Sequence, residues 1–190
     1  MLESTFAVRP AVQGEAGVLH DLAALTFPLA CPPSTSEAAK AAFIEQHLSR
    51  EAFKSYLVDP QRLVLVAERP AGAGEAAAEP AELIGYAMLV HGEPSDLDVA
   101  RAVQGRPTAE LSKLYVHQAQ HGGGIASELV EHALLAAAVH GAVSVWLGVN
   151  IYNARANRFY EKAGFEVVGR KGFLVGEVVE DDYVRERPLR

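Results

Sequence analysis

Hydrophobic and polar positions follow two periods along this chain, and the two periods predict alternating strands and helices. Runs that alternate or are continuously apolar predict strands over residues 5–9, 62–68, 83–90, 110–116, 144–149, 165–170 and 183–188. Apolar residues spaced three and four apart predict helices over residues 15–26, 34–48, 49–57, 125–140 and 154–163. The order predicts an α/β fold in a single domain over 1–190, with a mixed central sheet of about six to seven strands and helices on both faces.

Prolines, glycines and polar runs predict where these elements end. Pro28, Pro32 and Pro33 predict a break after the first helix. Residues 69–82 are Ala, Gly, Pro and Glu between two strands, which predicts a flexible hairpin loop. Residues 91–109 contain several Gly, Pro and Asp residues and are expected to form a second loop with a solvated acidic edge. Ser34 with Glu37 predicts a capping box at the second helix.

Three consecutive glycines, Gly122–Gly124, lie between a predicted strand and a predicted helix. Backbone N–H groups at such a turn and at the helix start can bind phosphate, because they point at one place and carry partial positive charge. Ile125 and Ala126 stand where a nucleotide-binding P-loop needs Lys and Ser/Thr, and Ser127 stands where a dinucleotide fingerprint needs its last glycine. Taken alone, the triplet fits a structural turn or a phosphate site equally well.

A second stretch, Asn153 to Phe165, has the pattern N-x-x-A-x-x-F-Y-x-K-x-G-F. With the glycine turn it resembles the GCN5-related N-acetyltransferase (GNAT) superfamily, and the two patterns span residues 110–165. The resemblance implies a GNAT-like fold and acetyl-CoA as cosubstrate. It assigns cofactor binding to Leu114, Tyr115, Val116, His121, Gly122, Gly123, Gly124, Ile125, Ala126, Asn153, Ala156, Phe159 and Lys162.

His121 departs from the family pattern, which has Arg or Gln at that position of the turn. The fixed positive charge on the phosphates is therefore missing. Most donors in such a turn are backbone N–H groups, so we expect phosphate binding to survive the change.

Two residues are candidates for proton transfer in the acetyltransferase reaction that the resemblance implies. Tyr160 matches the family's general acid, and a phenol stays protonated near neutral pH and can donate to the departing thiolate. Glu110 opens the strand that leads to the acetyl site and is the candidate general base, acting directly or through a water molecule.

The acceptor follows less directly from the sequence. Residues 26–36 form a proline-rich break between helices, and Thr26 and Phe27 are the predicted substrate-binding residues. Residues 147–149, 173–176 and 181–183 resemble a bacterial branch that includes polyamine N-acetyltransferases. Acidic residues in 59–100 and 180–182 would attract a cationic amine, so we expect a small cationic primary amine. A protein N-terminus or an aminoglycoside stays open, as does an acetyl-CoA-binding sensor without catalysis.

Composition narrows the remaining classes. The net charge of −7 argues against a nucleic-acid partner, and no apolar run is long enough to cross a membrane. A single cysteine, Cys31, and the lack of a leader-like start make the cytoplasm the expected location. His132 and His140 do not have the spacing of metal ligands, so no metal is expected. The resemblance makes a homodimer an option that the sequence does not decide.

Overall fold

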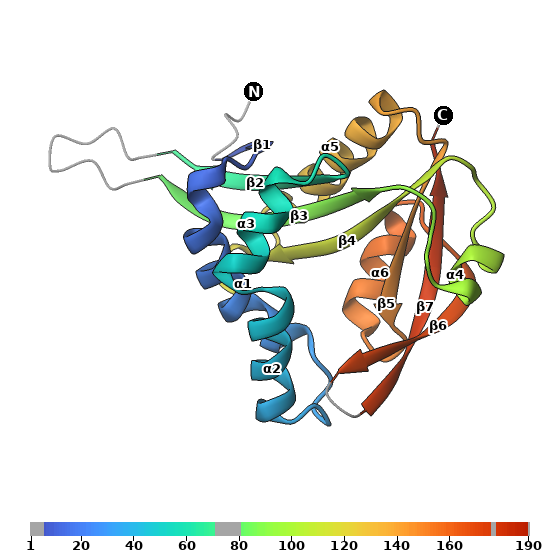
Figure 1. Cartoon of the computed structure of the whole chain (residues 1–190), viewed down its shortest axis with the longest axis horizontal. Helices are drawn as coiled ribbons and strands as arrows, with labels where there is room; N and C mark the ends of the chain where they lie inside the picture. The colour runs from blue at the N-terminus through green and yellow to red at the C-terminus, as the bar shows by residue number, and fades with distance from the viewer. Residues whose placement is uncertain (1–5, 71–80, 176–177, 190) are drawn as a thin grey trace, which may run out of the picture.

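The computed structural model describes residues 6–70, 81–175 and 178–189, and within them one sheet runs in the order β1-β2-β3-β4-β5-β7-β6 (Figure 1). Its strands are β1 (Ala7–Pro10), β2 (Arg62–Arg69), β3 (Glu82–His91), β4 (Thr108–Val116), β5 (Ser144–Asn150), β6 (Glu166–Val175) and β7 (Val178–Pro188). Every neighbouring pair is antiparallel except β4 and β5, which are parallel. The predicted mixed sheet and α/β class are confirmed.

Helices cover both faces of the sheet, also as predicted. They are α1 (Ala16–Ala30), α2 (Glu37–His47), α3 (Arg50–Val58), α4 (Leu97–Ala102), α5 (Ile125–Val139) and α6 (Ala154–Lys162), with short 3-10 turns η1 (Gln13–Glu15) and η2 (Gln118–Gln120). Strand β2 shows how alternation separates the faces. Val64 and Val66 pack with α1 and α3, whereas Leu65 and Ala67 pack with α5. Helices α1 to α3 lie together on one side in Figure 1.

Two element boundaries differ from the predictions at prolines and caps. Helix α1 continues through Pro28 to Ala30, because Phe27 is buried beside it and the proline costs one hydrogen bond near the helix end. The break falls at Cys31, before the Pro32-Pro33 pair. Helix α2 begins at Glu37 with Ser36 as its N-cap, and the Ser36 hydroxyl accepts from the Ala39 N–H at 3.1 Å. The predicted capping box at Ser34 is wrong by two residues.

The predicted loop over 91–109 contains the short helix α4. Asp96 caps it by accepting hydrogen bonds from the Asp98 and Val99 N–H groups. Val99 and Val103 bury their side chains against Trp146 and Val184. Six residues are too few to give a clear helical period, which is why the pattern did not reveal it.

The predicted hairpin over residues 69–82 is present at its base. Arg69 pairs with Glu82 at the ends of β2 and β3. The tip, residues 71–80, lies outside the described residues.

Candidate active site

Strands β4 and β5 pair over only three residues and then diverge. The last parallel pair is Glu110 with Trp146, although β4 continues to Val116 and β5 to Asn150. Figure 1 shows the two strands separating. The β5-facing backbone edge of residues 111–116 is therefore not paired with a neighbouring strand. Its polar groups are available to an extended ligand.

A groove follows this free edge, and most of the predicted cofactor residues meet there. It lies between β4, the start of α5, one face of α6 and the end of α1. Its lining is Thr26, Leu29, Ala30, Leu114, Tyr115, Val116, His121, Ala126, Asn153, Arg155, Ala156, Phe159 and Tyr160.

The glycine turn closes one end of β4 and starts α5. Gly122 and Gly124 have φ angles of 91° and 80°, in the left-handed region that favours glycine. The first bonded amide of the helix is that of Glu128, which donates to the Gly124 carbonyl at 3.1 Å. The N–H groups of residues 125–127 thus have no partner within the helix. This arrangement fits a phosphate at the helix N-terminus.

His121 is held at this turn by two hydrogen bonds. Arg155 of α6 donates from Nη1 to His121 Nδ1 at 3.0 Å, and His121 Nε2 lies 3.0 Å from the Val116 carbonyl oxygen. Because a guanidinium group can only donate, His121 Nδ1 accepts from Arg155 and Nε2 donates to the Val116 carbonyl. The fixed positive charge beside the turn is that of Arg155, a residue that the motif comparison did not select.

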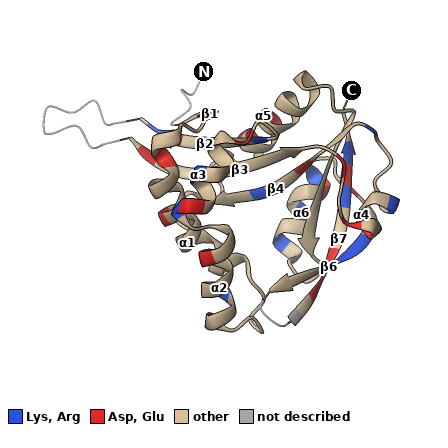
Figure 2. Ribbon diagram, in the orientation of Figure 1, with Lys and Arg blue, Asp and Glu red and all other residues tan. Residues whose placement is uncertain are grey.

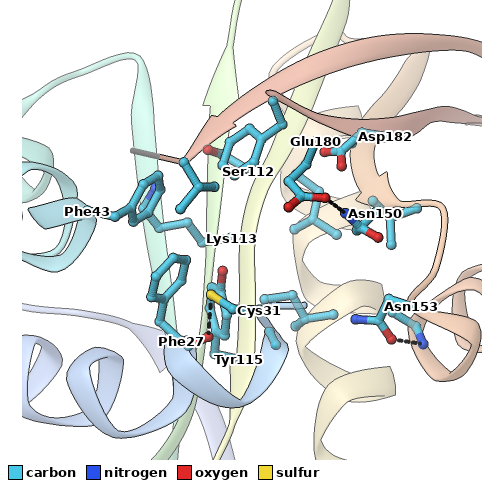
Figure 3. A pocket seen from close by; sticks show the side chains of 18 of the residues that line it. Phe27, Cys31, Phe43, Ser112, Lys113, Tyr115, Asn150, Asn153, Glu180 and Asp182 are labelled. Atoms are coloured by element: carbon cyan, nitrogen blue, oxygen red, sulfur yellow. Dashed lines mark hydrogen bonds between the residues drawn. The ribbon is translucent and has the colours of Figure 1, made fainter. Parts of the chain in front are cut away.

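A second hollow, the central pocket, shares Ala30, Leu114, Tyr115, Asn153, Ala156 and Tyr160 with the groove. It opens between α1, α2, β4, β5 and β7, and Figure 3 shows Phe27 and Phe43 facing Asn150 and Asn153 across it. Glu110 lines the central pocket but not the groove. A ligand extended along the groove would reach the central pocket beside Tyr160.

Tyr160 stands where the groove and the central pocket meet. Its ring packs edge-on against Phe159 and Phe165, with centroids 5.2 and 5.8 Å apart. Burial raises the pKa of its phenol, so the hydroxyl keeps its proton over the whole physiological range. Within the described part of the chain the hydroxyl makes no hydrogen bond, so its proton is available to a ligand.

Glu110 also lines the central pocket, at the point where β4 and β5 diverge. Burial raises the pKa of its carboxyl, and the positive charges of Lys171, Lys113 and Arg62 oppose that rise. A carboxylate with a raised pKa accepts a proton more readily near neutral pH, which suits a general base.

A bulge in β4 decides which of its residues face the central pocket. Leu89 of β3 pairs with Leu111 and Met88 pairs with Lys113, so Ser112 is an extra residue. The bulge changes the alternation. Leu111 and Leu114 both pack toward α5, and Tyr115 packs toward α1. Glu110, Lys113 and Tyr115 consequently share the pocket side.

Acidic side chains of β7 form the far wall. Glu180 and Asp182 line the central pocket, and Asn150 donates to Glu180 at 3.4 Å (Figure 3). Burial raises the pKa of Asp182 to about 6, an effect that Lys171 opposes. Two residues of the acidic stretch 180–182, Glu180 and Asp182, therefore line the central pocket.

The two predicted substrate residues are close in the chain but lie in different hollows. Phe27 lines the central pocket and stacks on Phe43, with ring centroids 4.5 Å apart. Thr26 lines the groove instead, and its hydroxyl is committed to the Leu22 carbonyl at 2.8 Å.

Five of the predicted cofactor residues line neither hollow, namely Gly122, Gly123, Gly124, Ile125 and Lys162. Ile125 is buried in the core, and Lys162 is exposed at the end of α6. Among the described residues, no group of three His, Cys, Asp or Glu side chains could hold a metal ion. No helix within the described ranges is long and apolar enough to cross a membrane.

Comparison with known proteins places this geometry in a family. The Acetyltransferase (GNAT) family model matches residues 34–165. An uncharacterized N-acetyltransferase of Mycobacterium tuberculosis is 41% identical over 175 residues, which cover 92% of this chain and 98% of that protein.

Two solved structures share the fold. The PaiA N-acetyltransferase of Thermoplasma acidophilum, in complex with coenzyme A, has a TM-score of 0.70 at 20% identity, covering 96% of this chain and 98% of that one. The spermidine/spermine N-acetyltransferase SpeG of Vibrio cholerae has a TM-score of 0.63 at 18% identity, covering 98% and 95%.

Proposed function

The chain belongs to the GNAT acetyltransferase family and is an acyl-CoA-dependent N-acetyltransferase, and from that premise we propose that it moves the acetyl group of acetyl-CoA directly to a small primary amine. The observation that carries the proposal is the junction of the groove and the central pocket at Tyr160, with Glu110 also lining the central pocket. Acetyl-CoA supplies the activated thioester.

The groove has the groups that acetyl-CoA needs. The start of α5, after the turn at Gly122–Gly124, offers free N–H groups to the pyrophosphate, and Arg155 adds a positive charge. The edge of Leu114, Tyr115 and Val116 that is not paired with β5 offers backbone groups to the extended arm, apart from the Val116 carbonyl, which contacts His121. Asn153 caps α6 by accepting from the Ala156 N–H at 3.0 Å, which fixes the groove's second wall.

Two side chains carry out the proton transfers of the reaction. Glu110 accepts a proton from the incoming ammonium group, directly or through a water molecule, because only a neutral amine can attack the thioester. Tyr160 donates its phenolic proton to the departing thiolate sulfur. Glu180 and Asp182 draw the cationic amine into the central pocket.

The test is release of the coenzyme A thiol from acetyl-CoA with a panel of polyamines, amino acids, aminoglycosides and N-terminal peptides. We expect release with at least one primary amine, accompanied by the acetylated product in a mass spectrum. Measurable acetyl-CoA binding without thiol release from any amine would overturn the proposal and favour an acetyl-CoA sensor.

A further inference from the structure

A third hollow, the outer cavity, adjoins the central pocket and is not used by the proposed proton transfers. Its wall comes from α2, α3, β2, the β3–α4 connection, β4, β5 and β6. It shares Glu110, Ser112, Lys113 and Lys171 with the central pocket, so one ligand can extend from one into the other.

Positive side chains surround the outer cavity. Arg62 lies over the Tyr56 ring, 4.8 Å from its centroid, and donates to Asp59 at 2.9 Å. Lys113 Nζ lies 5.6 Å from the same ring. Within the described ranges, no carboxylate lies within ion-pair distance of Lys113 or Lys171. Burial lowers the pKa of Lys113 to about 8, which leaves its ammonium group mostly charged near neutral pH, and Lys171 adds a second amine to the same wall.

The acidic side chains in the same wall are mostly committed elsewhere. Glu93 pairs with Arg106 at 2.6 Å, and Asp96 caps α4. Glu110 faces both hollows, and the outer cavity is where Arg62, Lys113 and Lys171 gather around it. Glu180 and Asp182 line the central pocket but not the outer cavity, Arg62 lines the outer cavity but not the central pocket, and Lys113 and Lys171 lie where the two hollows meet. Lys171 of β6 is the cross-strand partner of Asp182 of β7, and Figure 2 shows blue and red segments close together on these strands.

The backbone of β5 makes room for Lys171. A Cβ atom added at Gly148 would lie 2.6 Å from Lys171 Cε and 3.3 Å from Lys171 Nζ. The absent side chain at 148 therefore leaves the space that the lysine fills. On the other side, Lys171 Nζ lies 5.8 Å from the Trp146 ring centroid.

Trp146 provides an independent sign of a ligand. Its side chain is buried, it lines the outer cavity, and its Nε1–H has no acceptor among the described residues. A buried donor without an acceptor destabilises the fold unless a ligand or water satisfies it. An N–H donor beside the Lys171 ammonium group suits an anionic ligand oxygen.

We propose that the acceptor is an amino carboxylate, whose amine lies in the central pocket and whose carboxylate lies in the outer cavity against Lys113, Lys171 and the Trp146 N–H. The proposal rests on the proposed acetyltransferase function and names its substrate class. A polyamine has no anionic group that could bind these cations. The proposed substrate class therefore differs from the polyamines.

The experiment compares three acceptors with the same carbon chain, namely an ω-amino carboxylate, its amide and the corresponding diamine, for several chain lengths. We expect the carboxylate to have a kcat/KM at least tenfold above the amide and the diamine at the best length, since only the carboxylate forms charge-assisted hydrogen bonds with the lysines. Lys171→Met should bring the ratio of carboxylate to amide close to one.

Two further variants distinguish loss of the Lys171 contact from general damage to the protein. Gly148→Ala keeps the Lys171 charge but displaces its side chain, so it should also reduce the ratio. Lys54→Met removes an exposed lysine of α3 that pairs with Glu51 outside the cavity, and it should keep the wild-type ratio. Thermal melts establish that each variant is folded.

The outcomes separate the two proposals. Acetylation of amides or diamines as fast as the matching carboxylates would overturn the amino-carboxylate proposal and leave the acetyltransferase proposal standing. The same holds if Lys171→Met and Gly148→Ala keep the wild-type ratio. Binding of acetyl-CoA without thiol release from any amine would overturn both.

Discussion

Tyr160 gives the most direct test at the scale of single residues. Tyr160→Phe removes one hydroxyl and keeps the ring that packs on Phe159 and Phe165. We expect kcat to fall by roughly 10²- to 10⁴-fold, the usual contribution of a general acid, with little change in acetyl-CoA affinity or thermal midpoint. Steady-state kinetics and calorimetry measure the three quantities.

The matched control for that change is Tyr152→Phe. Tyr152 is 78% exposed and lies outside both hollows of the active site, so its hydroxyl should not matter. Full turnover by Tyr160→Phe would remove the acid role from this residue.

Glu110 should give the activity a characteristic pH dependence. Its carboxylate must be deprotonated to act as a base, and burial raises its pKa, so wild-type kcat/KM should rise with pH through that raised value. Glu110→Gln should lower the rate most between the raised pKa of Glu110 and the pKa of the amine, where the wild-type side chain is a carboxylate and the amine still needs a base, and least at high pH, where the amine is already neutral. Full pH–rate profiles of both proteins provide the measurement.

The control for Glu110 is Glu45→Gln, which changes an exposed residue of α2 and should leave the profile unaltered. A loss of equal size at every pH would assign Glu110 to binding instead of proton transfer.

Single residues also mark the limit of what the sequence could predict about the site. Tyr160, Asn153 and the glycine turn follow from local patterns, because each pattern keeps its residues on one turn or helix. Arg155 lies inside one of those patterns, but its role depends on reaching His121, 34 positions earlier in the chain. The charged Lys113 within a predicted strand was a signal in the sequence that could have pointed to the outer cavity.

The start of α5 supports a prediction at the scale of an element. Gly124 is the N-cap of α5 with φ of 80°, whereas Gly123, its neighbour in the same turn, does not have a left-handed φ. Gly124→Ala should lower the unfolding free energy by roughly 1–2 kcal/mol, the cost of a left-handed L-residue, and weaken acetyl-CoA binding. Denaturant unfolding and titration calorimetry measure the two effects.

Gly123→Ala is the internal control for the turn. Its added Cβ would meet only the Gln120 carbonyl oxygen at 3.4 Å, so stability should stay within about 0.5 kcal/mol of the wild type. Equal losses of stability in the two variants would contradict the backbone argument.

Elements with a clear hydrophobic period were predictable, and the exceptions have physical causes. Helix α1 passes Pro28 because burial of Phe27 outweighs one lost hydrogen bond. Helix α4 is too short to show a period. The bulge at Ser112 follows from pairing with β3, which no local pattern of β4 contains, yet it places Glu110, Lys113 and Tyr115 on one side of the strand.

At the scale of the whole molecule, the acceptor region depends on contacts between distant segments. Arg62, Lys113 and Lys171 come from β2, β4 and β6, and they meet only because the sheet order places β4 centrally. Segment composition predicted an acidic region that would attract a cation. The fold places Glu180 and Asp182 in the central pocket, Arg62 in the outer cavity, and Lys113 and Lys171 where the two hollows meet. Net charge by segment therefore could not predict the substrate class.

The divergence of β4 and β5 leads to a prediction for the whole sheet. The two halves of the sheet are joined by three residue pairs, compared with seven between β5 and β7. Acetyl-CoA bound in the groove would connect β4 and α5 to α6. At a free concentration of a hundred times its dissociation constant, acetyl-CoA should raise the free energy of unfolding by about 2.7 kcal/mol.

Hydrogen exchange should localise that gain. On addition of acetyl-CoA we expect amides in residues 111–116 and in the first turns of α5 and α6 to exchange up to roughly a hundredfold more slowly, because ligand contacts protect them directly. Amides of β1, far from the groove in the sheet order, should change less. Arg155→Met at the same ligand concentration should show a smaller effect, since it removes the charge beside the glycine turn. Equal slowing in all strands would mean that the ligand stabilises the fold globally, without bridging the two halves of the sheet at the groove.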